Sequence, residues 1–122
     1  MVSLTTGNAQ HSICPANWRL PSGGGGSGND FGDLDIAFGG TGNLVESGEA
    51  NIAKWQPSGP FRGAFSGYWG GSFGDQGAAG NLWSASANSG SAFVEYFGPS
   101  LVIPSDSYSD RYLGLGVRCL LN

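Results

Sequence analysis

Glycine is the feature that most constrains how this chain folds, because it accounts for 23 of the 122 residues. That is about two to three times the usual share of glycine in a protein. The glycines follow no collagen-like triplet period, and 12% of the residues are aromatic, so disorder explains the composition poorly. The sequence therefore predicts a single domain with a real core, little regular secondary structure and many irregular turns.

Charge limits the partners that the chain can have. Only 11% of the residues are charged, the net charge is −4, and Lys54 is the only lysine. Phosphate binding needs clustered Lys and Arg, so no nucleic-acid partner is expected. No run approaches the roughly 18 apolar residues of a membrane span, so no membrane insertion is expected. The N-terminus, Met1 to Leu4, lacks the features of a signal peptide. The chain is therefore either intracellular or a domain of a longer exported protein.

The two cysteines, Cys14 and Cys119, lie near opposite ends of the chain. If the termini meet, a disulfide that closes about a hundred residues would stabilise the fold by ~4–5 kcal/mol in the chain-entropy model. The alternative is a pair of buried, reduced thiols, which a cytosolic location would favour. Two cysteines alone do not make a zinc site, and neither a metal nor a cofactor is predicted.

Local patterns predict two helices. The first runs from about Asp30 to Phe38, where Asn29 or Asp30 can cap the start and Gly39-Gly40 ends it. The second is a short helix from Glu49 to Trp55. The apolar face of the first helix consists of Phe31, Leu34 and Phe38.

Strands are predicted at Leu82–Ser84, Ala92–Phe97 and Leu115–Leu121, and residues 1–13 are expected to form an edge strand or an arm. Asp75 to Gly77 marks a turn. The expected core consists of Trp18, Leu20, Phe31, Leu34, Phe38, Trp55, Phe61, Trp69, Trp83, Phe97, Leu115 and Val117.

The segment from Ser22 to Gly28 is almost all glycine and formally contains a G-x-G-x-x-G pattern at Gly23, Gly25 and Gly28. A dinucleotide site is nonetheless not predicted, because no buried strand precedes the pattern and the chain has no room for a βαβ unit. We expect a flexible lead into the first helix instead.

The C-terminal third alternates between two kinds of position. Some look fixed by packing, such as Trp83, Phe97 and Pro104, whereas the run Ser105–Asp110 has neither a helical nor a strand period and is predicted to be a loop. Tyrosines among Ser, Gly, Asn and Asp are typical of a paratope, in which rigid rings supply area and small polar groups adapt. The alternative is an ordinary solvated surface loop.

Several motifs together resemble a known family. They are Cys14-Pro-Ala-Asn-Trp-Arg-Leu-Pro21, Phe61-Arg-Gly63, Ser66-Gly-Tyr-Trp69, Gln76-Gly77, Trp83-Ser84 and Arg111…Gly114…Val117-Arg118-Cys119. Over residues 12–121 the chain resembles the Fibrobacter-type major paralogous domain, a compact variant of the C-type lectin fold close to the formylglycine-generating-enzyme branch. The resemblance implies an α+β fold with small antiparallel sheets, one or two helices and much irregular loop.

Members of that group serve as variable proteins of diversity-generating retroelements, in which adenines at the 3′ end of the gene are rewritten. The resemblance thus implies that residues 1–122 form one C-type lectin-like domain whose residues 82–119 are variable and face a ligand. It also suggests a cell-surface, secreted or virion location. Mutagenesis of AAC or AAT codons cannot produce Met, Trp, Gln, Lys or Glu. The stretch from Ser84 to Gly114 contains none of the first four and a single glutamate, Glu95, which must be fixed or come from another codon.

The expected function is a binding module for a protein or cell-surface ligand, and not an enzyme. Its predicted contact residues are Ser84, Ser86, Asn88, Ser91, Val94, Tyr96, Leu101, Ile103, Ser105, Asp106, Ser107, Tyr108, Asp110, Tyr112 and Leu113. Arg111 either contacts the ligand or holds the loop through a salt bridge.

Other functions fit the residues less well. Formylglycine-type catalysis uses active-site cysteines, but both cysteines lie at the domain ends, and the single histidine, His11, has no evident nucleophile beside it. The Asp106 and Asp110 pair lacks the alternating oxygen donors of a calcium loop. The sugar-binding signatures of calcium-dependent lectins are also missing. A fixed adhesin or carbohydrate-binding domain of the same fold remains the alternative.

Overall fold

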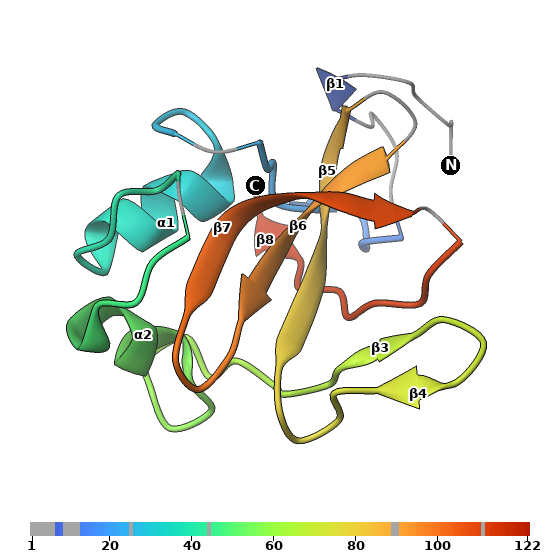
Figure 1. Ribbon diagram of the computed structural model, residues 1–122. Helices are drawn as coiled ribbons and strands as arrows, with labels where there is room; N and C mark the ends of the chain where they lie inside the picture. The colour runs from blue at the N-terminus through green and yellow to red at the C-terminus, as the bar shows by residue number, and fades with distance from the viewer. Residues whose placement is uncertain (1–6, 9–12, 25, 44, 89–90, 111) are drawn as a thin grey trace.

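The computed structural model describes residues 7–8, 13–24, 26–43, 45–88, 91–110 and 112–122, with backbone alone for residues 7, 8, 49, 88 and 105–110. This part of the chain forms two helices and three antiparallel sheets (Figure 1). The elements are β1 (Gly7–Asn8), β2 (Trp18–Arg19), α1 (Asp30–Ala37), α2 (Glu49–Trp55), β3 (Tyr68–Trp69), β4 (Phe73–Gly74), β5 (Gly80–Asn88), β6 (Ser91–Phe97), β7 (Val102–Asp110) and β8 (Leu120–Leu121).

The central sheet has the strand order β1-β5-β6-β7, and two small sheets pair β2 with β8 and β3 with β4. Figure 1 shows α1 and α2 together on one side of the central sheet and the β3–β4 hairpin projecting from the other side. The predicted α+β class with small sheets and much loop is confirmed. No helix in the described ranges is long and apolar enough to cross a membrane.

Both predicted helices form where the local sequence favours them. α1 begins after Asn29, which has an extended backbone, although its side chain makes no capping hydrogen bond. Asp33 in the first turn accepts a hydrogen bond from the Gly28 N–H (2.9 Å). The helix ends at Ala37 with Phe38 as its C-cap, and the next residue, Gly39, has a φ of 100°, which suits a residue without a β-carbon.

The prediction that Ser105–Asp110 is a loop is wrong, because these residues continue β7. Their backbone pairs with β6, where Ala92 lies opposite Ser109 and Ser91 lies opposite Asp110. The pairing shifts register between Ala92 and Tyr96. A strand is held by its backbone, and register shifts break the two-residue alternation, so the side-chain pattern did not reveal it.

The core lies between the two helices and the central sheet. Its buried apolar cluster consists of Phe31, Ile52, Trp55, Leu82, Phe97 and Val102, with Leu34, Phe38, Phe61 and Phe65 packed against it. Trp55 and Phe97 are fully buried, and their rings stack with centroids 6.1 Å apart. The core predictions for Leu20, Phe31, Trp55 and Phe97 are confirmed.

Three predicted core residues are exposed instead. Trp18, Trp69 and Val117 keep 40–46% of their surface accessible. Trp18 and Trp69 belong to the two-residue strand pairs β2–β8 and β3–β4, which lie outside the central sheet. Trp83 and Leu115 are half-buried. The sequence analysis missed Ile52, Ala79, Leu82, Val94 and Val102 as buried residues.

The termini meet through a covalent link. A disulfide joins Cys14 and Cys119, whose Cα atoms lie 5.8 Å apart, and β2 pairs with β8 beside it. The prediction that the two cysteines lie close is confirmed. Of the strand predicted over Leu115–Leu121, only β8 forms, and the residues before it contribute isolated bridges such as Leu82–Gly116.

Candidate functional site

The predicted contact residues do not form one set, because the structure buries some of them. Ser84, Ser86 and Val94 are at most 7% exposed, so the expectation that they lie on an open face is wrong. The Ser84 hydroxyl donates to the carbonyl of Phe93 (2.7 Å) and accepts from the Ser86 N–H (3.1 Å). These two serines therefore shape β5 and do not offer their hydroxyls to a ligand.

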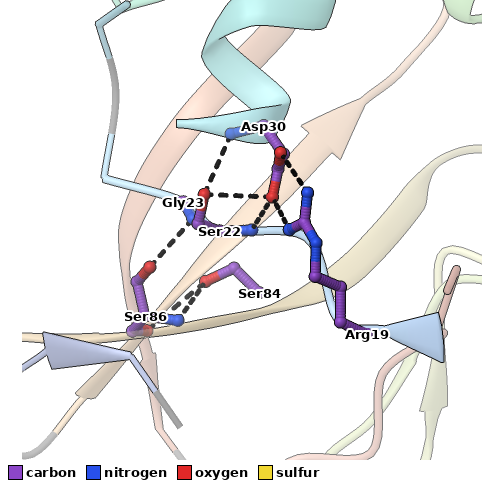
Figure 2. Close-up of polar contacts among 6 residues, drawn as sticks. All are labelled: Arg19, Ser22, Gly23, Asp30, Ser84 and Ser86. Carbon is purple, nitrogen blue, oxygen red and sulfur yellow. Dashed lines mark hydrogen bonds and ion pairs between the residues drawn. The ribbon is translucent and has the colours of Figure 1, made fainter. Parts of the chain in front are cut away.

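Ser86 also holds the glycine-rich segment against the sheet. The Gly23 N–H donates to the Ser86 hydroxyl (2.9 Å), as Figure 2 shows. A β-carbon at Gly23 would lie 2.8 Å from both the β-carbon and the hydroxyl of Ser84, which is too close for any other residue. Gly23 is therefore packed on β5, and the expectation of a flexible lead into α1 is wrong at this position.

The same segment is fixed to α1 by an ion pair. The Arg19 guanidinium binds both oxygens of the Asp30 carboxylate, and the Ser22 N–H donates to Asp30 Oδ2 (2.8 Å) (Figure 2). The Arg19 hydrogen bonds are the largest cause that lowers the pKa of Asp30 to about 2, and Ser22 adds to them. Asp30 thereby joins β2, the glycine-rich segment and the start of α1.

The remaining described contact residues lie at two places. Tyr96 and Ile103 are cross-strand partners on β6 and β7, and both are half-buried, as are Ser91 and Leu101. Tyr112 is 79% exposed and precedes the half-buried Leu113. The predicted residues whose side chains lie outside the described set are Asn88, Ser105, Asp106, Ser107, Tyr108 and Asp110. His11 and Arg111 also lie outside it.

An exposed aromatic hairpin borders Tyr112 and Leu113, and the sequence analysis missed it. The Trp69 N–H donates to the Gly114 carbonyl, the Gly114 N–H donates to the Trp69 carbonyl (both 2.8 Å), and Leu113 lies over Gly70. The rings of Trp69 and Phe73 meet edge to face with centroids 4.7 Å apart, and Phe73 is 75% exposed. The aromatics spaced among glycines between Phe61 and Phe73 were the available signal, but Trp69 was assigned to the core.

Several polar side chains are buried inside the protein, between the helices and the central sheet. They are the side chains of Asp35, Glu46, Glu95 and Asn51. Burial raises the pKa of Glu95 well above its usual value, and the charges of Asp35 and Glu46 raise it further. None of these four residues was predicted to have a role beyond the possibility that Glu95 is fixed.

Family models, curated proteins and solved structures were compared with the chain, and none of them matches it.

Proposed function

We propose that the protein is a binding module whose ligand surface is built from the end of the β6–β7 strand pair and the segment that follows β7. One observation carries the proposal: Tyr112 is largely exposed and Leu113 half-buried immediately after β7, whereas Val94, Glu95 and Phe97 on the neighbouring strand are buried. A rigid strand pair that ends in accessible aromatic and apolar residues is suited to binding a protein, because hot spots favour such anchors.

The resemblance to variable proteins of diversity-generating retroelements supports the same surface. On this proposal the domain has a C-type lectin fold, and the ligand-facing positions near the end of β7 are rewritten while buried ones stay constant. The full burial of Glu95, which adenine mutagenesis of AAC or AAT codons cannot produce, agrees with a constant position. A near-identical non-coding copy of the 3′ end, with adenines at the variable codons and a reverse-transcriptase gene nearby, would test this origin.

A matched pair of display libraries tests the binding function. The first randomises Ile103, Tyr108, Asp110, Tyr112 and Leu113 with AAC-type codons, and the second randomises Ala37, Ala50 and Ala53, which are exposed on the helices. Selection against several unrelated soluble proteins should yield binders mainly from the first library. Equal yields from the two libraries would contradict the proposal.

Tolerance of the fold is the second measurement. If these positions form a ligand surface and do not fill space, combined replacement of Tyr108, Asp110, Tyr112 and Leu113 by Asn, Ser or Ala should leave a cooperative melt near the original temperature, since surface substitutions cost about 0.5 kcal/mol or less each. Val94→Asn is the control. Because Val94 is buried, this substitution places a polar amide in the core and should lower the melting temperature strongly. Collapse of the combined variant would show that these side chains fill space.

A fixed adhesin or carbohydrate-binding domain is the second candidate. The exposed rings of Tyr68, Trp69 and Phe73 favour it, because flat aromatic surfaces can stack on sugars as well as on protein side chains. Two results together would support this function over the first. The wild type would bind a polysaccharide and Trp69→Ala would not, and no non-coding copy of the 3′ end of the gene would be found.

A further inference from the structure

Glu95 places a carboxyl group in the packed interior of the protein. It lies in β6, none of its surface is exposed, and its cross-strand partner on β5, Leu82, is also buried. Side chains two residues apart on a strand share a face, so Glu95 points the same way as Phe97, whose ring stacks on Trp55 of α2. Tyr96, the only other ionisable residue of β6, points to the opposite face. Glu95 therefore lies at the interface between the central sheet and the helices.

Neither oxygen of the Glu95 carboxyl group has a hydrogen-bond partner in the part of the chain that the structure describes. The one ion pair found there joins Arg19 to Asp30. The ammonium group of Lys54 donates to the carbonyl of Phe38 (3.2 Å). A carboxylate that loses its water without gaining a donor is far more costly to bury than a neutral carboxyl group. The surroundings of Glu95 therefore favour its protonated form.

The ionisable groups on the surrounding elements are mostly acidic. β5 carries none, and β7 carries three whose side chains lie outside the described set: Asp106, Tyr108 and Asp110. On the helix side the buried acids are Asp35 of α1 and Glu46 of the loop before α2. Burial is the largest cause that raises the pKa of Glu95, and the charges of Asp35 and Glu46 raise it further. Burial and neighbouring charge thus act in the same direction.

We propose that Glu95 is carried as a neutral carboxylic acid in the folded protein, so that folding takes up one proton and the packing of the helices on β6 weakens as the pH rises. In the unfolded chain the group returns to water and to its ordinary pKa of 4.5. Above pH 4.5 the folded state then binds more protons than the unfolded state. Stability is therefore greatest below this pH and falls as the pH rises toward the higher pKa of the folded state. The proposal is independent of the ligand surface near Tyr112.

Urea unfolding at a series of pH values from 5 to 8 tests the proposal. The wild type should lose stability across this range relative to Glu95→Gln, which keeps the side-chain volume but cannot ionise. One linked proton changes the ratio of their folding constants by at most about tenfold per pH unit. Comparing the two proteins cancels the contribution of His11, the only histidine, which titrates in the same range. Asp75→Asn is the matched control, because Asp75 is exposed, and it should keep the wild-type slope.

Carbon-13 NMR of glutamate-labelled protein reads the protonation state directly. The chain has only three glutamates, Glu46, Glu49 and Glu95, so few carboxyl signals need to be resolved. The Glu95 signal, assigned through its bonds to the backbone, should remain at its protonated position at pH 6 in the folded wild type. If Glu95→Gln does not fold, this titration alone decides the question.

Three outcomes would overturn the proposal. The first is a wild type whose stability relative to Glu95→Gln does not fall between pH 5 and pH 8. The second is a Glu95 signal that titrates near its ordinary value of 4.5 in the folded protein. The third is an Asp75→Asn variant that loses the slope as fully as Glu95→Gln, which would assign the slope to the overall charge of the protein.

Discussion

Two aromatic clusters of similar composition have opposite environments in this protein. Around Trp55, the rings of Phe38, Phe61 and Phe97 lie within 4.8–6.1 Å, and Trp55 itself is fully buried. Around Trp69, the Phe73 ring lies at 4.7 Å, yet both side chains are largely exposed. Glycines flank both clusters. The difference is that the first cluster lies between α1, α2 and the central sheet, whereas Trp69 and Phe73 belong to the β3–β4 hairpin, which projects away from that sheet (Figure 1).

The two regions must therefore be stabilised in different ways. The Trp55 cluster relies on apolar burial and close packing, which scale with the area removed from water. The small sheets that carry Trp18 and Trp69 bury little, and they depend on backbone pairing and, for β2 and β8, on the Cys14–Cys119 disulfide. Exposed aromatic area that contributes little to stability is available for binding.

The largest expected effect comes from the covalent link on the weakly buried side. The double variant Cys14→Ser, Cys119→Ser should lose about 4–5 kcal/mol of unfolding free energy, because the bridge closes about a hundred residues. Denaturant titration measures the loss, and the chemically reduced wild type is the control. A loss below about 1 kcal/mol would show that the terminal strands are held by packing after all.

The two tryptophans give the direct comparison. Trp55→Ala should cost about 3–5 kcal/mol, because it removes a fully buried ring and the indole N–H bonded to Asp35. Trp69→Ala should cost about 1 kcal/mol or less, as an exposed position. Equal destabilisation in the two melts would mean that the hairpin aromatics belong to the core.

Glycine replacements sharpen the same contrast. A β-carbon at Gly80 would overlap the Phe97 ring and the Ala64 carbonyl, so Gly80→Ala should cost about 1–3 kcal/mol through overpacking. A β-carbon at Gly114 would lie 3.1 Å from the nearest atom beyond its chain neighbours, Trp69 Cβ, so Gly114→Ala should cost less than about 1 kcal/mol. Urea titrations of both variants check the order, and a larger loss for Gly114→Ala would refute it.

The smallest effect concerns the ion pair that links the two regions. The folded-state pKa of Asp30 is about 2, below its ordinary 3.8, so its stabilising contribution is present above pH 3.8 and is lost as the pH falls toward 2. Asp30→Asn should therefore lower stability at pH 7 by about 1 kcal/mol or less, because the pair is partly exposed, and should flatten the acid side of the profile. Unfolding curves between pH 2 and pH 7 measure this. An unchanged acid limb would show that Arg19 and Asp30 are not coupled.

Local sequence determined the parts that depend on neighbours in the chain. The periodic Phe31, Leu34 and Phe38 and the glycines after them were enough to place α1, and α2 forms over the predicted range Glu49–Trp55. The closeness of the two cysteines was expected only from their placement at the edges of the family resemblance. The α+β class was an expectation from the family resemblance, and the two locally predicted helices agree with it.

Only the tertiary structure decided what is buried and what a ligand can reach. Both Trp55 and Trp69 have a large apolar side chain that favours burial. The fold buries Trp55 between the helices and the central sheet and leaves Trp69 partly exposed. Ser84 and Ser86 looked free of packing rules, but Gly23 and Phe93, distant from one another in sequence, occupy their hydroxyls. The strand at Ser105–Asp110 and the buried Glu95 escaped sequence analysis for the same reason, because backbone pairing and burial depend on segments brought together by the whole fold.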